Sequence, residues 1–291
     1  MTIHPTREEF RRLAREHTVI PVWRELLADL ITPVAAFARL TRDGEPGFLF
    51  ESVEHGERWS RWSFVGRRPA ATLVSRGGTV EVHGGTLPEG IVLDQGILGA
   101  VESLLATYRS PVDDDLPPLH SGLVGYLGYD VVREVEQLPD TPDDDQGLPE
   151  AVLSIAGELA AFDHFRSRVV LIANAYVLGE DPSDEDLDRA YDEAVARLEQ
   201  LAIDGAAPLE EPFLAPPDPD DPLPEVTSNL GAEAYERAVD AAKEHILAGD
   251  IFQVVLSQRF DFQLDADPFD VYRVLRQINP SPYMYLVRHP E

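Results

Sequence analysis

The stretch that decides the fold is residues 151–178, which read AVLSIAGELAAF, then DHFRS, then RVVLIANAYVL. The first and third segments are long apolar runs, at 151–162 and 168–178, and the polar segment at 163–167 between them is turn-like. Apolar runs joined by a short turn are typical of paired antiparallel strands. The sequence therefore predicts an antiparallel strand pair across 151–178.

Further β-like runs precede this pair. Short apolar stretches alternate with Gly, Pro and Arg turns, and the glycines of 122–130 permit close backbone approach. We expect strands at residues 32–40, 47–52, 62–65, 71–75, 79–83 and 122–130.

Helical periodicity recurs along the chain, with apolar residues three and four positions apart. It predicts helices at residues 7–17, 94–108, 184–201, 232–248 and 268–278. For the helix at 232–248, Ser228 is the expected N-cap, and Gly249 the residue that ends it. Strands are expected at 251–262 and 283–287, and the second runs to the end of the chain. We therefore predict an α+β fold with mixed or antiparallel sheets packed against helices, C-terminally incomplete.

A segment rich in Pro, Asp and Glu, at residues 205–226, separates the helix predicted at 184–201 from the helix predicted at 232–248. Such a composition cannot bury enough apolar surface to fold alone, so it predicts a surface connector. An acidic segment that binds a partner is the alternative.

The bulk composition excludes several classes of function. The net charge of −29 repels nucleic-acid phosphates and anionic lipids, and no apolar run is long enough to cross a bilayer. No nucleic-acid or membrane role is therefore expected. The absence of cysteine excludes disulfides and thiolate chemistry. A cytoplasmic location is the default expectation.

The common catalytic strings are absent, including the phosphate-binding glycine loop, the His-Glu-x-x-His zinc motif and the Gly-x-Ser-x-Gly elbow. Two runs of three aspartates, at 113–115 and 143–145, could hold a hard cation. Both lie in proline-containing loops, which favours solvated surface charge.

Four strings carry a family resemblance. They are FLFES at 48–52 with GERWSRWSFVG at 56–66, GLVGYLGYD at 122–130, GDIFQVVLSQRF at 249–260 and NPSPYMY at 279–285. Together and in this order they resemble anthranilate synthase large subunits, from about residue 18 onward. One departure is Ser121, where that family usually has another glycine.

The resemblance implies a division of the chain into three parts. Residues 18–178 correspond to the N-terminal region of the family. Residues 179–227 correspond to a helix and the acidic connector. Residues 228–291 correspond to the start of a chorismate-binding domain.

The first and last strings can form an amino-acid site. A zwitterionic ligand needs an acceptor for its ammonium, a donor for its carboxylate and an apolar slot for its ring. A glutamate, a serine hydroxyl and an arginine offer the polar contacts, and a Pro-Tyr-Met segment offers flat, polarizable surfaces. The resemblance assigns feedback L-tryptophan to Ser52, Pro282, Tyr283 and Met284, and with them to Glu51 and Arg61. Alternatively these residues only cap strands, form surface ion pairs or pack in the core.

Gln253 is the residue placed near the chemistry by the resemblance. Relatives that add water to chorismate carry a lysine there, which can act as a general base. A neutral glutamine cannot, which suits ammonia as the nucleophile. The alternative is a structural strand glutamine.

The resemblance implies a lyase that converts chorismate and ammonia to anthranilate and pyruvate in tryptophan biosynthesis. A glutamine amidotransferase subunit would supply the ammonia. Mg²⁺ would engage the substrate, with its ligands expected downstream of Glu291, so the chain alone is expected to be inactive. Aminodeoxychorismate synthase component I and a non-catalytic tryptophan-binding fragment are the alternatives.

Overall fold

The computed structural model describes residues 2–52, 61–139, 141–179, 181–209, 213–218, 220 and 222–289. The chain forms two compact units. The first comprises Met1–Pro212 together with Arg276–Glu291, and the second comprises Phe213–Leu275.

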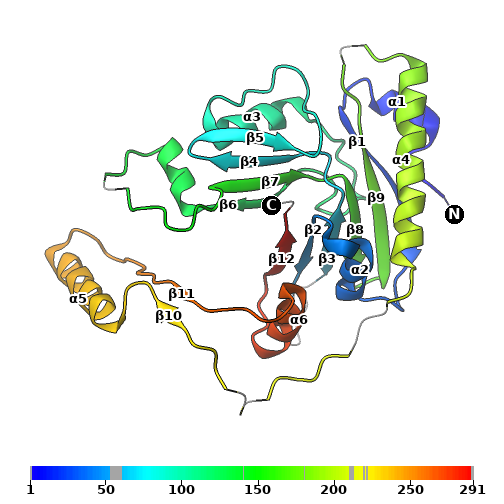
Figure 1. Ribbon diagram of the computed structural model, residues 1–291. Coiled ribbons are helices and arrows are strands. Elements are labelled where there is room, and N and C mark those ends of the chain that lie inside the picture. The colour runs from blue at the N-terminus through cyan, green and yellow to red at the C-terminus, as the bar shows by residue number, and fades with distance from the viewer. Residues whose placement is uncertain are drawn as a thin grey trace. The chain divides into compact units, whose positions relative to one another are not determined.

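A six-stranded antiparallel sheet forms the centre of the first unit (Figure 1). Its strands lie in the order β1 (Val19–Leu27), β9 (Arg168–Tyr176), β8 (Glu158–Asp163), β3 (Trp62–Arg67), β2 (Gly47–Glu51) and β12 (Met284–Arg288). Of the antiparallel pair predicted from the runs at 151–162 and 168–178, the part formed by β8 and β9 is confirmed, with Glu158 opposite Ala173 and Asp163 opposite Arg168. Asp163 Oδ1 closes the turn by accepting hydrogen bonds from the amides of Phe165 and Arg166.

The second sheet of this unit has four antiparallel strands. They lie in the order β5 (Thr79–His83), β4 (Thr72–Arg76), β7 (Ala151–Ile155) and β6 (Leu123–Leu127). Helix α3 (Gly96–Thr107) packs against β4 and β5, and its buried Ile97, Ala100 and Leu104 join a core with Leu73 and Leu153. Two short 3₁₀ helices, η1 (Arg42–Gly44) and η2 (Tyr129–Glu134), follow α2 and β6.

The apolar run at 151–162 is not the single strand predicted from sequence. It forms β7 in the four-stranded sheet and β8 in the six-stranded sheet, with the change of sheet at Ala156 and Gly157. A Cβ atom at Gly157 would lie 1.9 Å from the backbone oxygen of Arg68. Arg68 has a φ of 44° and follows β3, where the chain makes the same change of sheet on its way to β4. Both crossings therefore meet at one close backbone contact.

Residues 32–40 form a helix, so the predicted strand there is wrong. Thr32 is the N-cap of α2 (Pro33–Leu40) and accepts a hydrogen bond from the Ala35 amide at 3.2 Å, with Pro33 in the first turn. A threonine followed by a proline is a helix-start signal. Buried Ala36, Phe37 and Leu40 have helical spacing and pack the helix onto the sheet.

Strand β1 was not predicted. It carries Pro21, which cannot donate a backbone hydrogen bond and is therefore confined to an edge strand. β1 lies at the edge of the six-stranded sheet, paired along its length with β9.

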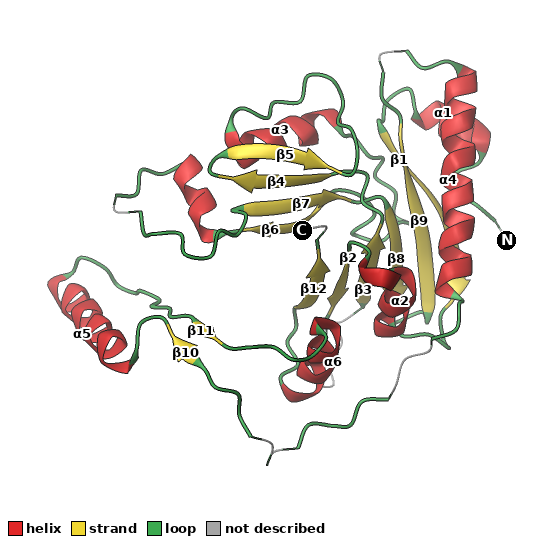
Figure 2. Cartoon of the chain, viewed as in Figure 1, coloured by secondary structure: helices red, strands yellow, loops and turns green. Residues whose placement is uncertain are grey.

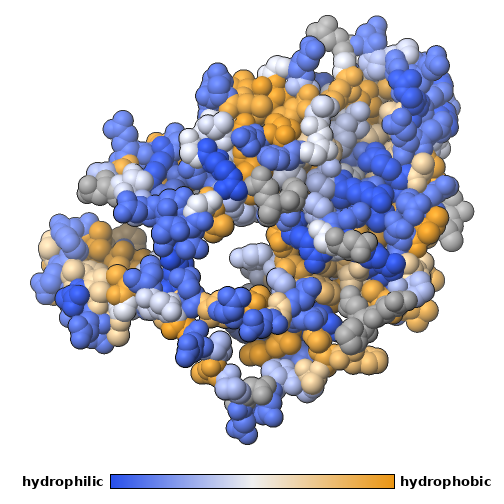
Figure 3. All heavy atoms as spheres, viewed as in Figure 1, coloured by the Kyte–Doolittle hydropathy of each residue, from blue (hydrophilic) through white to orange (hydrophobic). Residues whose placement is uncertain are grey.

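Helix α4 (Asp184–Gly205) packs on β9, β1 and β8 through Leu187, Tyr191, Ala194, Leu198 and Leu201. Its opposite face is hydrophilic (Figure 3). A capping box between Ser183 and Asp186 starts the helix.

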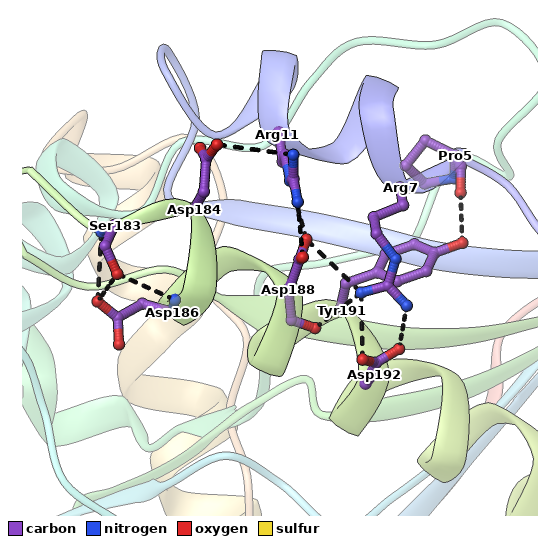
Figure 4. Close-up of polar contacts among 9 residues, drawn as sticks. All are labelled: Pro5, Arg7, Arg11, Ser183, Asp184, Asp186, Asp188, Tyr191 and Asp192. Carbon is purple, nitrogen blue, oxygen red and sulfur yellow. Dashed lines mark hydrogen bonds and ion pairs between the residues drawn. The ribbon is translucent and has the colours of Figure 1, made fainter.

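The short helix α1 (Arg7–Leu13) docks on α4 through ion pairs (Figure 4). Arg11 Nε and Nη2 lie 2.8 and 2.6 Å from the two carboxylate oxygens of Asp188. Arg7 pairs with Asp192 and lies over the ring of Tyr191, whose hydroxyl donates to the backbone oxygen of Pro5. Hydrogen bonds from Arg11 lower the pKa of Asp188.

The second unit contains α5 (Ala232–Ala248), the two-residue strands β10 (Thr227–Ser228) and β11 (Phe260–Asp261), and most of α6 (Pro268–Ile278). The predicted strand at 251–262 is wrong, because residues 251–259 are irregular and only Phe260 and Asp261 pair (Figure 2). The N-cap of α5 is Gly231 rather than Ser228, whose hydroxyl accepts from the Gly231 amide at 3.0 Å. Gly249 ends α5 with a φ of +82°, as predicted.

No helix in the described part of the chain has the length and apolarity needed to cross a bilayer.

The close contact between the two sheets predicts the effect of a single methyl group. Gly157→Ala should lower the free energy of unfolding by about 1–3 kcal/mol, because the new Cβ would overlap the Arg68 backbone oxygen. Urea denaturation followed by far-UV circular dichroism measures the change.

Gly205→Ala, at the end of α4, is the matched control. Its Cβ would come no closer than 3.9 Å to the nearest neighbouring atom, which belongs to Leu40 of α2. That change should alter the unfolding free energy by about 1 kcal/mol or less. Equal stability of Gly157→Ala and the unaltered chain would show that the crossing relaxes at little cost.

Candidate functional site

A cavity of about 930 Å³ lies in the first unit, between the two sheets. Strands β2, β3 and β12 supply one part of its lining, and Gly125, Tyr126 and Leu127 of β6 supply another. Such a volume is in the range typical of small-molecule sites.

The strand pairing of β2 with β12 places the predicted residues together. Glu51, the last residue of β2, lies opposite Met284, the first residue of β12. Ser52 follows Glu51, and Pro282 and Tyr283 precede Met284, so two segments distant in the sequence meet at one end of this strand pair. All five residues line the cavity.

Glu51 gives the cavity a buried carboxylate. The residue is only 6% exposed. Its Oε2 lies 2.7 Å from Arg276 Nε, and its Oε1 accepts a hydrogen bond of 2.9 Å from Arg276 Nη2. The charge is therefore compensated where it is desolvated, as a buried carboxylate requires.

Aromatic side chains form the apolar wall. Trp62 and Phe64 of β3 lie nearly parallel, with ring centroids 6.2 Å apart, and both line the cavity. Tyr126 meets the ring of His289 edge to face at 5.7 Å. Met284 is buried, whereas Tyr283 is 85% exposed. This wall can accept a flat aromatic ring.

Arg61 is not among the residues that line the cavity. Its guanidinium donates to Asp163 Oδ2 from Nη2 at 2.6 Å and from Nε at 3.0 Å, and lies 4.8 Å from the ring centre of Trp62. Burial alone would raise the pKa of Asp163, but hydrogen bonds from Arg61 and from the amides of the turn lower it overall. The structure thus joins Arg61 to the β8–β9 turn.

His164 lies in the same turn and contacts β3. Its Nε2 is 2.8 Å from the buried hydroxyl of Ser63. Burial lowers the pKa of His164, and the charges of Glu51 and Asp163 offset part of that effect. Burial also lowers the pKa of His289, which lines the cavity.

Gln253 belongs to the second unit, where it is exposed within the irregular segment 251–259. Residues 56–60 of the quoted string GERWSRWSFVG lie outside the described residues. The described residues contain no group of three His, Asp or Glu side chains placed to hold a metal ion.

Comparison with known proteins identifies the family. Residues 48–291 match the family of chorismate binding enzymes.

The chain belongs to the chorismate-binding enzyme family.

Its relatives include anthranilate synthase component 1 of Mycolicibacterium smegmatis, 43% identical over 286 residues, which cover 98% of this chain and 53% of that protein. Anthranilate synthase component 1 of Arthrobacter globiformis is 42% identical over 287 residues, with the same coverage of each. The chain therefore spans about half the length of these relatives. The crystal structure of anthranilate synthase component I from Streptococcus pneumoniae shares the fold, with a TM-score of 0.58 and 24% identity over 88% of this chain and 53% of that one.

Several residues that line the cavity or contact its surroundings were not predicted from sequence. Trp62 and Phe64 lie inside a quoted string, and their alternation along a strand could have indicated a shared face. Arg276 and His164 had no comparable signal, because their positions depend on the end of α6 and on the β8–β9 turn.

The two histidines whose pKa values are lowered, His164 and His289, predict how stability depends on pH. The unfolded chain, with histidine pKa values near 6.5, takes up protons more readily than the folded chain, in which the pKa values of His164 and His289 are lowered. The free energy of unfolding should therefore be fully maintained above pH 6.5 and fall as the pH drops through the lowered pKa values. Urea denaturation at pH 7.5, 6.5 and 5.5 measures this slope.

The double variant His164→Gln and His289→Gln should have a flatter profile over the same range. The carboxylates titrate lower, from an ordinary pKa of 3.8 for Asp163, and so contribute little there. An unchanged slope in the double variant would show that other groups set the dependence.

Proposed function

We propose that the cavity between β2, β12 and β6 is a regulatory site for L-tryptophan. The observation that carries the proposal is the pairing of Glu51 with Met284, which joins a carboxylate and a serine to a Pro-Tyr-Met segment. A carboxylate accepts hydrogen bonds from an α-ammonium group, and the Ser52 hydroxyl can donate to the ligand carboxylate. Trp62, Phe64 and Met284 offer the aromatic and polarizable surfaces that suit an indole ring.

We propose further that the full-length protein is a component I of anthranilate synthase, a lyase of tryptophan biosynthesis. In this proposal chorismate reacts with ammonia from a partner glutamine amidotransferase, loses its 4-hydroxyl and eliminates pyruvate to give anthranilate. Similarity to anthranilate synthase component 1 of Mycolicibacterium smegmatis and of Arthrobacter globiformis, at 43% and 42% identity, supports it. Tryptophan would then be the end product that inhibits the first enzyme of its own synthesis. The reaction would take place in the cytoplasm.

Mg²⁺, when bound, would neutralise the carboxylates of chorismate and stabilise the departing group. The proposal assigns its ligands to no residue of this chain. Gln253 is proposed to lie near the substrate and, being neutral, to leave ammonia as the nucleophile without activating water.

Ligand binding tests the regulatory site directly. L-Tryptophan should bind this chain with a stoichiometry of one, as measured by isothermal titration calorimetry. Met284→Thr should weaken binding about tenfold, because it removes the thioether from the buried end of β12. Ser52→Phe should weaken it at least as much by filling the cavity.

Leu275→Thr, in the second unit, is a control for the loss of an apolar side chain and should bind as the unaltered chain does. If neither Met284→Thr nor Ser52→Phe changed the affinity, tryptophan would not bind in this cavity.

Activity of the full-length enzyme tests the lyase proposal. Anthranilate formation from chorismate and ammonia, followed by its fluorescence, should be inhibited by tryptophan. Ser52→Phe should relieve this inhibition and keep the ammonia-dependent rate. Gln253→Ala should lower turnover about tenfold or more. A wild-type rate in Gln253→Ala would leave this glutamine a structural role only.

A further inference from the structure

We propose that Arg276 is a positioning residue of the tryptophan pocket, which compensates the charge of the Glu51 carboxylate and orients it to receive the ligand's ammonium group. This inference rests on the function proposed above. It adds a residue that does not line the cavity and acts on the ligand through another side chain.

The contact has the geometry of an oriented pair. Nη2 of Arg276 donates a hydrogen bond of 2.9 Å to Oε1 of Glu51, and Nε lies 2.7 Å from Oε2 as an ion-pair contact. A guanidinium that contacts both oxygens of a carboxylate restricts the orientation of that carboxylate as well as its place. A carboxylate has about four acceptor positions, so contact with Arg276 is compatible with a hydrogen bond from a ligand's ammonium group in the cavity.

Burial makes the cation necessary. The Glu51 side chain is 4% exposed and that of Arg276 is 31% exposed. An ionised carboxylate at this depth is costly unless a cation accompanies it. The guanidinium of Arg276 is such a cation, in direct contact with the Glu51 carboxylate.

The same chain segment supplies the cation and the apolar contacts. Arg276 lies in the last turn of α6, and six residues later the chain enters the cavity at Pro282 and begins β12 at Met284, opposite Glu51. The carboxylate is therefore held between Arg276 and the strand that carries the ring-binding residues. A shift of one would displace the other.

Other charged groups near Glu51 come from the β8–β9 turn. The charge of Glu51 acts to raise the pKa of His164, and Asp163 beside this histidine is paired with Arg61. Burial lowers the pKa of His164, so at neutral pH this histidine carries little charge. Arg276, by contrast, is a cation in direct contact with Glu51.

A pair of ligands separates positioning from simple structural support. L-Tryptophan and indole-3-propionate share the indole ring and the carboxylate, but only tryptophan has the ammonium group. Isothermal titration calorimetry of the whole chain at pH 7.5 gives the ratio of their affinities. The unaltered chain should favour tryptophan, and Arg276→Gln should reduce that preference by roughly 10- to 100-fold, the range for a hydrogen bond to a charged group. Arg276→Lys, which keeps the charge and loses the two-oxygen contact, should retain part of the preference.

Matched variants complete the design. Glu51→Gln should lose the preference as Arg276→Gln does, and combining the two should cause no further loss, because both act through one carboxylate. Arg273→Gln, one turn earlier on α6 and paired with Asp270 at 2.8 Å, should keep the full preference.

The outcomes distinguish this inference from the function on which it rests. Failure of the unaltered chain to bind tryptophan overturns the proposed regulatory site, and the positioning role with it. Tryptophan binding with an unchanged preference in Arg276→Gln overturns the positioning role alone. An equal loss of affinity for both ligands in Arg276→Gln does so too, because it indicates structural support only. If Arg276→Gln does not fold, Arg276→Lys carries the test, and a preference equal to that of the unaltered chain counts against the proposal.

Discussion

The close approach of two backbone segments where the chain changes sheets is the constraint on which the rest of the first unit depends. Gly157 lies against the backbone oxygen of Arg68, with no room for a side chain. Beside this contact Arg67 is buried and donates from Nε to Glu158 at 2.7 Å and from Nη1 to Asp204 of α4 at 2.6 Å. These contacts bind β3, β8 and α4 together at the point where both sheets begin to diverge. The cavity is lined by strands of both of those sheets.

Part of the fold could be predicted because its physical cause is local. The β8–β9 pair follows from two apolar runs around a polar turn, and α4 from the helical spacing of apolar residues within 184–201. The single strand predicted at 151–162 was wrong because hydrophobicity is uniform across β7 and β8. The change of sheet lies at a close contact with Arg68, which is far away in the sequence. The helix at 33–40 was missed because its apolar content outweighed a proline that helices accept in their first turn.

The candidate site could be predicted as a set of residue types but not as a geometry. Ser52 and Met284 were chosen from separate strings, and only the register of β2 with β12 shows that their strand ends meet. Arg61 was chosen as a cation for the ligand's carboxylate, yet in the structure it is paired with Asp163. Arg276 pairs in the same way with Glu51, and nothing in the local sequence of Arg276 indicates that pairing. Which cation meets which carboxylate depends on the tertiary fold, because arginine side chains are long and the chain contains many acidic residues.

The position of β12 has a consequence for the order in which the protein folds as it is synthesised. β12 completes the six-stranded sheet at β2, yet the ribosome makes it after all of the second unit. Until residue 288 has emerged, the outer edge of β2 lacks its neighbouring strand, with backbone donors and acceptors that another extended chain could pair with. The nascent chain therefore exposes the edge of β2 through much of its translation. The segment that later pairs with β2 also supplies Pro282, Tyr283 and Met284 to the proposed tryptophan pocket.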